Sequence, residues 1–370
     1  MLLVKSKGTE FFYGNDGYCC KEAKEIPERV RAVGVSCLSS VLTEVECREM
    51  NDGMWKTIEY LTSNLKAPIK RGEPNTYRGI FELAPNHGGL IQHHRMGHAD
   101  YVWKLRGNTK LLEAYTHIYN CKAEDLLVSF DGINCSLGPI MGVRKRGMYQ
   151  GRSWLHLDQR LSDRSERCVQ SWVTANDIEV GDGTLVFLSG SHLLHEKFAK
   201  HFGLKKETKD WFKLNPEHEK WYEEQGCKRI CLTVPAGSQV FWDSRTVHSG
   251  QEALYEEDCP KRSKPRTARN VAYLCYQPRE KTTLKKRKRI FDESDPWFLR
   301  LSSHWPNNMK LFGQYPRTFG NEVPEGCCQS DPTRYWSFVP DLPMPKLNKL
   351  ARRLAGIDGE REKTILSYLK

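Results

Sequence analysis

Two short stretches decide the fold of this chain: VQSWVT at residues 169–174 and TLVFL at residues 184–188, joined by a segment that ends in Gly181-Asp182-Gly183. Both stretches are rich in β-branched and aromatic residues, and the glycine-rich segment is typical of a turn. No helical sequence separates them. Consecutive strands without an intervening helix favour an antiparallel sandwich or barrel.

Further strand-like runs lie on both sides of this pair. They cover residues 126–130, 153–158, 230–234, 239–242 and 270–276. Their short length and close spacing predict a protein that is mainly β, with helical additions. A charged, tryptophan-containing segment at 197–226 has helical character and interrupts the strands, so we expect it to be an insertion.

Helical patterns precede the first strand. Thr43 is a predicted N-cap, with Glu46 three residues later, and apolar residues then recur at helical spacing. Two more helical stretches begin near His98 and Asn108. We therefore expect an irregular N-terminal segment, a helical support, a β core with one insertion, and a basic C-terminal extension, rich in proline and aromatic residues, that packs on the core. The bounds of these four parts are 1–40, 41–120, 121–280 (insertion 197–226) and 281–370.

The composition suits a globular protein, since 39% of the 370 residues are hydrophobic and 28% are charged. The longest apolar runs are far shorter than the roughly 20 residues of a membrane-spanning helix. The N-terminus has only four apolar residues before Lys5, too few for a secretory signal. We therefore expect an intracellular protein without a membrane partner, in which the 13 cysteines are mostly reduced.

The net charge of +11 is concentrated, because Lys285–Arg289 alone carries five positive charges and the remainder of the chain only +6. Such a run can be a nuclear localisation signal, a contact for nucleic acid or for a substrate, or a solvated loop. The sequence leaves these three interpretations open, and with them a cytoplasmic or a nuclear location and a nucleic-acid partner. It gives no indication of oligomeric state.

His156 and Asp158 are candidate metal ligands, because residues two apart on a strand project from the same face. His98 and Asp100 have the same spacing, but they lie at the start of a helical pattern, where side chains two apart diverge. His248 is the best candidate for a third ligand, since it follows a predicted strand and precedes a glycine at which the chain is expected to leave the sheet.

Two histidines and one carboxylate leave open positions on a metal, as in non-haem iron(II) oxygenases. A dicarboxylate co-substrate would also need a cation for its far carboxylate. Arg269 begins the run at 270–276 and offers a bidentate fork for that carboxylate, and Arg266 is the reserve candidate.

The other histidines are expected to have structural roles. His192 is expected to stabilise a turn, and His304 to pack beside Trp305. A dense cluster is not expected to bind a second metal, because it lies in glycine-rich and helical sequence; its members are His87, His93, His94 and His98.

Residues 169–177 and 181–192 resemble the signature of the phytanoyl-CoA dioxygenase family, in which a strand and a turn lead to a G-x-L-x-x-x-x-G-S-H motif. With the histidine and aspartate candidates and Arg269, the match in motif order spans roughly residues 120–280. The resemblance implies a double-stranded β-helix, or jelly roll, that binds Fe(II) and 2-oxoglutarate and uses O2.

The resemblance also implies roles for single residues. His156, Asp158 and His248 would hold the iron, Arg269 would pair with the C5 carboxylate of 2-oxoglutarate, and Trp172 would line the co-substrate pocket. One departure from the family is the separation of 21 positions between His248 and Arg269, which is longer than usual and leaves Arg266 as an alternative.

The implied reaction is hydroxylation of a small organic substrate, with release of succinate and CO2. The same chemistry on a nucleic acid or a protein is one alternative, and a jelly-roll binding module without activity is another. The complete set of two histidines, one aspartate and one arginine argues against the inactive module.

Overall fold

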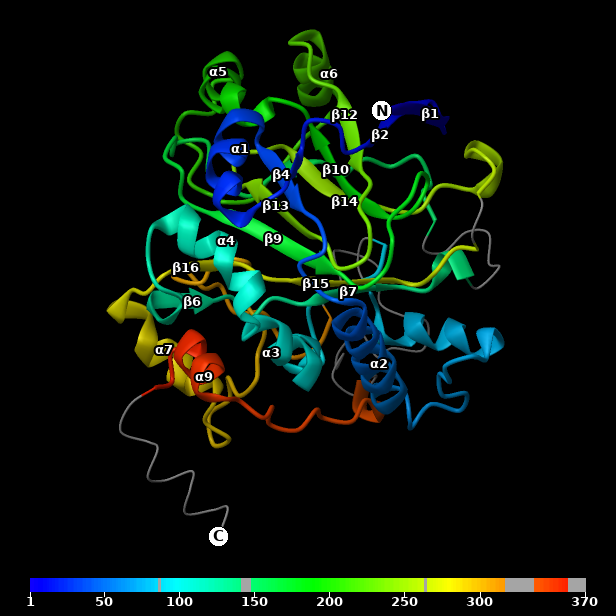
Figure 1. The fold of residues 1–370 in the computed structure, drawn as a ribbon, viewed down its shortest axis with the longest axis vertical. Helices are drawn as coiled ribbons and strands as arrows, with labels where there is room; N and C mark the ends of the chain where they lie inside the picture. Colours follow the sequence, from blue (N-terminus) through cyan, green and yellow to red (C-terminus); the bar gives the residue numbers. More distant parts are fainter. Residues whose placement is uncertain (86–87, 141–147, 263–264, 317–335, 359–370) are drawn as a thin grey trace.

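The computed structural model describes the chain except for residues 86–87, 141–147, 263–264, 317–335 and 359–370. Its centre consists of two seven-stranded sheets that face each other (Figure 1). Sheet A has the order β1 (Leu2–Ser6), β2 (Thr9–Gly14), β12 (Arg229–Leu232), β10 (Thr184–Leu188), β14 (His248–Gln251), β8 (His156–Leu157) and β11 (Phe212–Lys213). Sheet B has the order β3 (Cys19–Cys20), β4 (Val35–Leu38), β13 (Gln239–Asp243), β9 (Val169–Thr174), β15 (Arg269–Tyr273), β7 (Ile133–Ser136) and β5 (Leu90–Ile91).

The strand order is that of a jelly roll. From β7 to β15 the chain crosses between the sheets after each strand except from β10 to β12, where it stays in sheet A: β7, β9, β13 and β15 belong to sheet B, whereas β8, β10, β12 and β14 belong to sheet A. Neighbours among these eight strands are antiparallel. The expected double-stranded β-helix is therefore confirmed, and the predicted strands at 169–174 and 184–188 coincide with β9 and β10.

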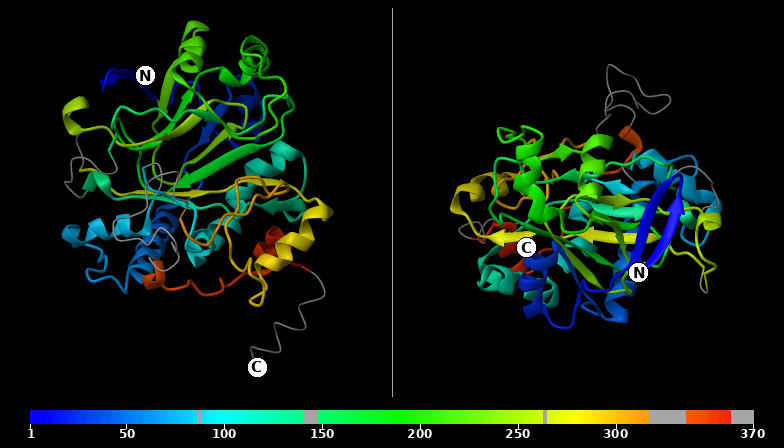
Figure 2. Two further views of the ribbon diagram at one scale, coloured as in Figure 1. Left: turned by 180° about the vertical axis from the view of Figure 1, so that it is seen from behind. Right: turned by 90° about the horizontal axis from the view of Figure 1, so that it is seen from above.

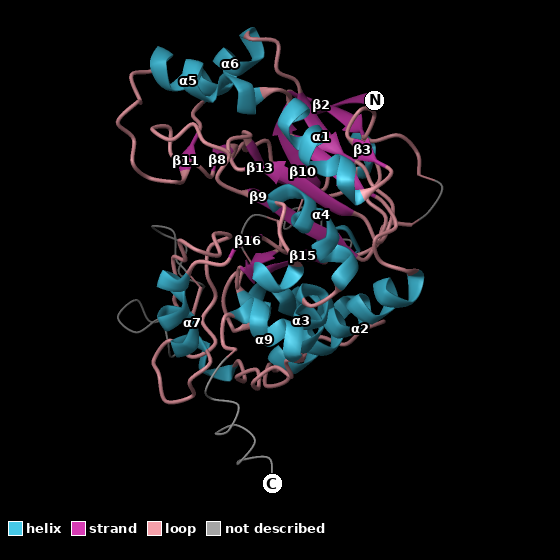
Figure 3. Cartoon of the chain, turned by 60° about the vertical axis from the view of Figure 1, so that its left-hand side comes forward, coloured by secondary structure: helices cyan, strands magenta, loops and turns pink. Residues whose placement is uncertain are grey.

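Helices cover the outer faces of both sheets. The α-helices are α1 (Ile26–Val33), α2 (Glu44–Leu61), α3 (Asp100–Arg106), α4 (Thr109–Tyr119), α5 (His195–His201), α6 (Pro216–Glu224), α7 (Leu284–Ile290) and α9 (Lys349–Ala355). Figure 3 shows α5 and α6 at one end of the molecule, beyond sheet A, and α2, α3, α7 and α9 at the other end. Thr43 forms the predicted capping box of α2 with Glu46, and α4 begins at the expected place, with Asn108 as its N-cap. No helix in the described part of the chain has the length and apolar character that a membrane crossing requires.

Three apolar layers follow from this arrangement. Trp172, Phe187 and Val240 belong to the cluster between the sheets. A second cluster joins sheet B to the helices on its outer face, and a third joins sheet A to α5 and α6. The inner cluster surrounds the polar site described below, so that site is held by packed side chains on both sheets.

The N-terminal 40 residues are not irregular, contrary to expectation. They form β1 to β4 and α1, and both sheets gain strands from them (Figure 2, blue). β2 pairs with β12 in parallel and β4 pairs with β13, so these strands are fixed by partners about 200 positions away. Cys19 and Cys37 form a disulfide between β3 and β4, and the other nine described cysteines are free, which agrees with the expectation that most are reduced.

Two other strand predictions need correction. The run at 153–158 is a strand only at His156–Leu157. The run at 270–276 is divided, because β15 ends at Tyr273 and β16 (Tyr276–Pro278) turns away to pair with β6 (Leu126–Val128). His248 follows β13 (Gln239–Asp243), as expected, but the chain does not leave the sheet at Gly250, because His248 opens β14, in which Gly250 pairs with Leu185.

The basic run Lys285–Arg289 lies on α7 and is not a solvated loop. Arg287 is fully buried and donates to the backbone carbonyls of Ala355, Pro306, Val128 and Leu354. Lys286 donates to the carbonyl of Met309, and Arg289 pairs with Asp295 at 2.6 Å. Three of the five charges are thus engaged by the C-terminal extension and the core, which leaves only Lys285 and Lys288 of the run without such contacts among the described residues.

Candidate metal centre

His156, Asp158 and His248 come together on the inner side of sheet A. One ligand atom of each lies within 4.8 Å of the others, and all three residues are buried. His156 pairs directly with His248 across β8 and β14, and side chains of directly paired residues lie on the same face. Asp158 follows β8 two residues after His156, as the sequence spacing predicts.

The two imidazoles are held in the same tautomer. His156 Nδ1–H donates to the carbonyl of Trp154 at 3.0 Å, and His248 Nδ1–H donates to the carbonyl of Thr246 at 2.9 Å. Each Nε2 therefore carries the lone pair. His248 Nε2 accepts a hydrogen bond from the indole Nε1–H of Trp242 at 3.1 Å, which agrees with this assignment.

The carboxylate of Asp158 lies between the two rings. Its Oδ1 is 3.6 Å from His156 Nε2, and its Oδ2 is 3.3 Å from His248 Nε2. Gln170, on β9 of the opposite sheet, donates to Oδ2 at 3.0 Å. Burial by itself would raise the pKa of this carboxyl, but the neighbouring His304 and His156 hold the pKa well below its usual value. Burial lowers the pKa of His248, which favours its neutral form.

These donors fit a divalent metal of the iron(II) type. The set contains two imidazole nitrogens and one carboxylate, and it leaves further coordination positions open. Hydrogen bonds from Nδ1 to backbone carbonyls orient both rings, as is usual for metal-binding histidines. Among the residues that the structure describes, this is the group of histidine, cysteine and acidic side chains compact enough to hold a metal ion.

Arg269 and Arg266 differ in what already binds them. Arg266 donates to the carbonyl of Leu254 at 2.7 Å, and its Nε lies 3.9 Å from Asp182. Arg269 is buried, its Nε has no hydrogen-bond partner, and no carboxylate in the described part of the chain forms a salt bridge with it. Burial lowers the pKa of Arg269, while the neighbouring Tyr273 raises it. The Nε of Arg266 also lacks a hydrogen-bond partner, so the two arginines differ in the carbonyl and carboxylate contacts that Arg266 makes and that Arg269, among the described residues, does not.

The turn before β10 makes room for this arginine. A Cβ atom at Gly183 would lie 3.3 Å from Arg269 Cδ, so a larger residue would crowd the guanidinium stem. Arg269 pairs with Ser136, and Tyr273, four residues along β15, pairs with Trp172. Because side chains alternate along a strand, Arg269, Tyr273 and Trp172 share the face of sheet B on which Gln170 reaches Asp158. Two of the predicted co-substrate residues, Arg269 and Trp172, therefore lie on the inner face of sheet B, which faces the metal candidates on sheet A.

Two further side chains, both from outside the jelly-roll strands, lie near the three ligand candidates and were not predicted there. The Trp211 ring lies 5.9 Å from the His156 ring, and His304 Nδ1 lies 3.9 Å from Asp158 Oδ2. Trp211 precedes β11 in the insertion, and His304 belongs to the C-terminal extension, where packing was expected. Neither segment contains a motif, so only the folded chain shows that they reach the site.

The histidine cluster at 87–98 serves the fold where the structure describes it. His93 Nε2 contacts the carbonyl of Leu83 at 2.7 Å, and His98 contacts the carbonyl of Arg300 and the indole of Trp103. Burial lowers the pKa of His98 to about 3. His87 lies outside the described residues. Within them, these histidines form no group that could hold a metal.

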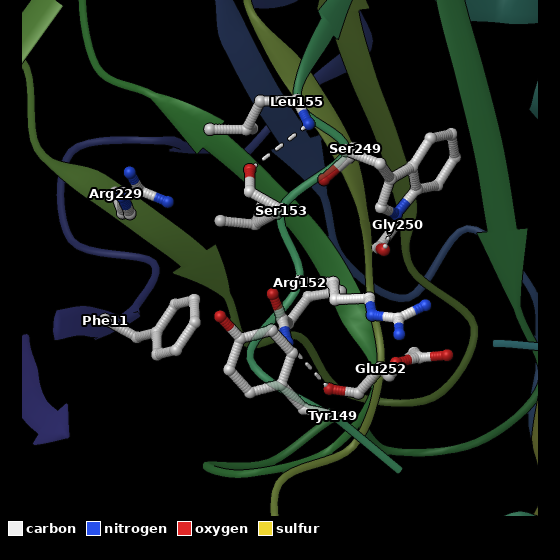
Figure 4. A pocket seen from close by; sticks show the side chains of 12 residues that line it. Phe11, Tyr149, Arg152, Ser153, Leu155, Arg229, Ser249, Gly250 and Glu252 are labelled. Atoms are coloured by element: carbon white, nitrogen blue, oxygen red, sulfur yellow. Dashed lines mark hydrogen bonds between the residues drawn. The ribbon is translucent and has the colours of Figure 1, made fainter. Parts of the chain in front are cut away.

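A pocket lies on the other side of sheet A (Figure 4). It is lined by Phe11, Tyr149, Val186 and Ser249, among others. Val186 pairs with Ser249, and each is adjacent in sequence to a residue of the inner face, Phe187 or His248. Because side chains alternate along a strand, those of Val186 and Ser249 point to the outer face. Trp154 also lines this pocket, and its ring stacks on the His156 ring with the ring centres 4.8 Å apart, so the pocket adjoins the candidate site.

Known proteins resemble this chain in sequence and in structure. A family model described as phytanoyl-CoA dioxygenase matches residues 30–253. This range contains His156, Asp158 and His248 but ends before Arg266 and Arg269, so the choice of arginine depends on the structure alone.

One curated relative is the Ava biosynthesis cluster protein O of Aspergillus versicolor, which is 26% identical over 239 residues. The alignment covers 62% of this chain and 70% of that protein. Among solved structures, the non-haem α-ketoglutarate-dependent epimerase SnoN from nogalamycin biosynthesis is 15% identical with a TM-score of 0.38 and covers 69% of this chain and 82% of its own. A nickel complex of the non-haem monooxygenase ThoJ is 16% identical with a TM-score of 0.39, covering 68% and 76%. These structural similarities are too low to bear on ligands or reaction.

Proposed function

The chain belongs to the phytanoyl-CoA dioxygenase family of Fe(II)/2-oxoglutarate-dependent oxygenases, and on that premise we propose that it hydroxylates a small organic molecule, with 2-oxoglutarate and O2 consumed and succinate and CO2 released. The observation that carries the proposal is the convergence of His156, Asp158 and His248 within 4.8 Å on the inner face of sheet A. These three side chains would hold the iron, which supplies the redox chemistry with O2 when it is bound.

Protein groups would bind and orient the co-substrate. The guanidinium of Arg269 would pair with the C5 carboxylate of 2-oxoglutarate, and the hydroxyl of Tyr273 lies beside that guanidinium. Trp172 would form an apolar side of the same pocket. A charge pair in such a buried place is strong because little water competes with it, and it also fixes the direction from which the dicarboxylate approaches the metal.

A small substrate is favoured over a macromolecule. The relative from Aspergillus versicolor is described as a protein of a biosynthesis cluster, and biosynthetic enzymes of this kind act on small molecules. Arg287 is the centre of the basic run, and its guanidinium is buried among backbone carbonyls rather than offered to phosphates. A binding module without activity would have no use for a complete set of ligands with both imidazoles oriented.

The decisive experiment is anaerobic calorimetry of purified protein with Fe(II) and 2-oxoglutarate, followed by measurement of succinate after O2 is admitted. We expect 2-oxoglutarate to bind only when Fe(II) is present, and succinate to form slowly even without the hydroxylated substrate. Asp158→Ala is the matched control and should abolish both. Absence of 2-oxoglutarate binding by the folded wild-type protein would refute the proposal.

A further inference from the structure

Two segments outside the jelly-roll strands each bring one ring against the candidate metal centre. Trp211, from the insertion between β10 and β12, lies with its ring at 38° to that of His156 and 5.9 Å from it. His304, from the C-terminal extension, places Nδ1 3.9 Å from Asp158 Oδ2. Neither residue belongs to a jelly-roll strand, so both rings reach the site from additions to the jelly roll.

Trp211 is exposed but firmly held. Its residue surface is 53% exposed, which is unusual for a tryptophan beside a buried polar site. The preceding residue, Asp210, accepts two hydrogen bonds from Arg160, at 2.8 and 3.1 Å, and one from Arg167 at 3.0 Å. The following residues, Phe212 and Lys213, pair with β8. An indole fixed on both sides and open to solvent is a preformed surface for a flat apolar group.

His304 is also held from both sides. Ser302 donates its backbone N–H to the carbonyl of Phe130 at 2.9 Å and accepts from the Phe130 N–H at 3.0 Å. Trp305 is buried against Cys168 and Cys275. His304 Nε2 is buried and has no hydrogen-bond partner among the described residues. Because buried polar atoms are rarely left unpaired, this nitrogen is available to a group of a bound molecule.

Arg167 connects the two segments. Its guanidinium donates to Asp210, next to Trp211, and lies 4.5 Å from the centre of the Trp305 ring, next to His304. Asp210 in the insertion and Trp305 in the C-terminal extension are 95 positions apart in the sequence, yet one side chain contacts both. The two rings therefore have a defined relative position, as two sides of one binding site require.

We propose that Trp211 and His304 are substrate-contacting residues, and that the substrate is a small molecule with a flat apolar part, which stacks on Trp211, and an oxygen that hydrogen-bonds to His304 Nε2. This inference rests on the proposed function, because it places the substrate beside the iron and 2-oxoglutarate site. Stacking on the indole supplies affinity that tolerates different ring systems, whereas the hydrogen bond to His304 selects among them.

The test compares 1-naphthol with naphthalene, which share the flat ring but differ in the hydroxyl oxygen. Affinities are measured by fluorescence titration on protein loaded with Co(II) and 2-oxoglutarate under anaerobic conditions. Wild-type protein should bind 1-naphthol about tenfold more tightly than naphthalene, the effect of one hydrogen bond. Trp211→Ala should weaken both by about tenfold, with partial recovery in Trp211→Phe. His304→Ala should weaken only 1-naphthol, so that the preference disappears.

Matched controls use residues of the same type elsewhere. Trp297→Ala removes a half-buried ring that contacts Arg289 and Arg300, and His117→Ala removes an exposed histidine of α4. Both should leave the two affinities unchanged.

Several results would overturn the inference. They are failure of the wild-type protein to bind either probe, an unchanged affinity in Trp211→Ala, and an equal loss for both probes in His304→Ala. A loss of Co(II) affinity beyond tenfold in His304→Ala would also do so, because His304 would then be a metal ligand. If wild-type protein fails to bind 2-oxoglutarate at all, the proposed function fails first and separately.

Discussion

His156 and His248 are direct partners across two antiparallel strands, and their ring centres lie 4.6 Å apart. The pairing brings together residues that are 92 positions apart in sequence. Each ring is oriented by the carbonyl of the residue two positions before it, Trp154 for His156 and Thr246 for His248. The strand pair therefore presents two imidazoles on one face before any metal arrives, which reduces the reorganisation that binding requires.

Replacement of any of the three ligand candidates should remove metal binding while the fold is kept. We expect His156→Ala, Asp158→Ala and His248→Ala each to weaken Co(II) binding by at least 100-fold, because two remaining donors cannot hold the ion. Calorimetry gives the affinity, and circular dichroism checks the fold. His98→Asn is the control, because His98 belongs to the other His-x-Asp pair of the chain. This variant should bind Co(II) as tightly as the wild type does. Equal affinity in His248→Ala and wild type would contradict the assignment.

The sequence predicts the central strands because their signals are local. β9 and β10 combine β-branched and aromatic residues with a glycine-rich turn, and both are correct to the residue. β14 has the sequence HSGQ, which carries no apolar pattern, and its conformation comes from pairing with β10 and β8. Of the N-terminal strands, β2 and β4 have partners, β12 and β13, that lie far along the chain, whereas β1 and β2 also form a local hairpin that the sequence prediction missed.

The site was predictable as far as the family motif extends. His156 and Asp158 follow from strand spacing, but nothing local distinguishes Arg269 from Arg266. Only the folded chain shows that Leu254 and Asp182 already occupy Arg266. Trp211 and His304 are close to the site because Arg167 connects two segments without a motif, and no pattern in the sequence records such a contact.

Replacement of Arg269 should affect co-substrate binding, whereas replacement of Arg266 should affect stability. Arg269→Ala removes the one cation proposed for the C5 carboxylate, so we expect 2-oxoglutarate affinity to fall by about 100-fold or more. Co(II) affinity should not change. Arg266→Ala leaves the carbonyl of Leu254 without its donor and should lower the free energy of unfolding by about 1–3 kcal/mol. Calorimetry and urea unfolding separate the two effects. The reverse pattern would assign the co-substrate to Arg266.

The basic run should contribute to stability rather than to nucleic-acid binding. Arg287→Met removes a buried guanidinium that donates to four backbone carbonyls, so we expect a loss of about 3 kcal/mol or more in the free energy of unfolding. Lys285→Ala and Lys288→Ala, on the same helix, should change stability by less than about 0.5 kcal/mol. In fluorescence anisotropy with duplex DNA, the two lysine variants should bind no more weakly than the wild type. Salt-dependent binding lost in Lys285→Ala would restore the nucleic-acid interpretation.

Stability should depend on pH through the buried His98. In the folded chain its pKa is about 3, because burial disfavours the charged ring, whereas an unfolded chain has the ordinary value of 6.5. Between these values the unfolded chain takes up a proton that the folded chain does not. The contribution of His98 to the free energy of unfolding is therefore complete above about pH 6.5, and it falls by as much as about 1.4 kcal/mol for each pH unit below that.

His98→Gln has no ring to protonate, so its stability should fall less steeply between about pH 7 and pH 5. It should be less stable than the wild type at pH 7, because the contacts of His98 with Arg300 and Trp103 are changed. Urea unfolding at several pH values measures both slopes, and the difference between them removes the contribution of other buried groups. Parallel curves would show that His98 is already charged in the folded protein or that it is solvated, and either result would contradict its structural role.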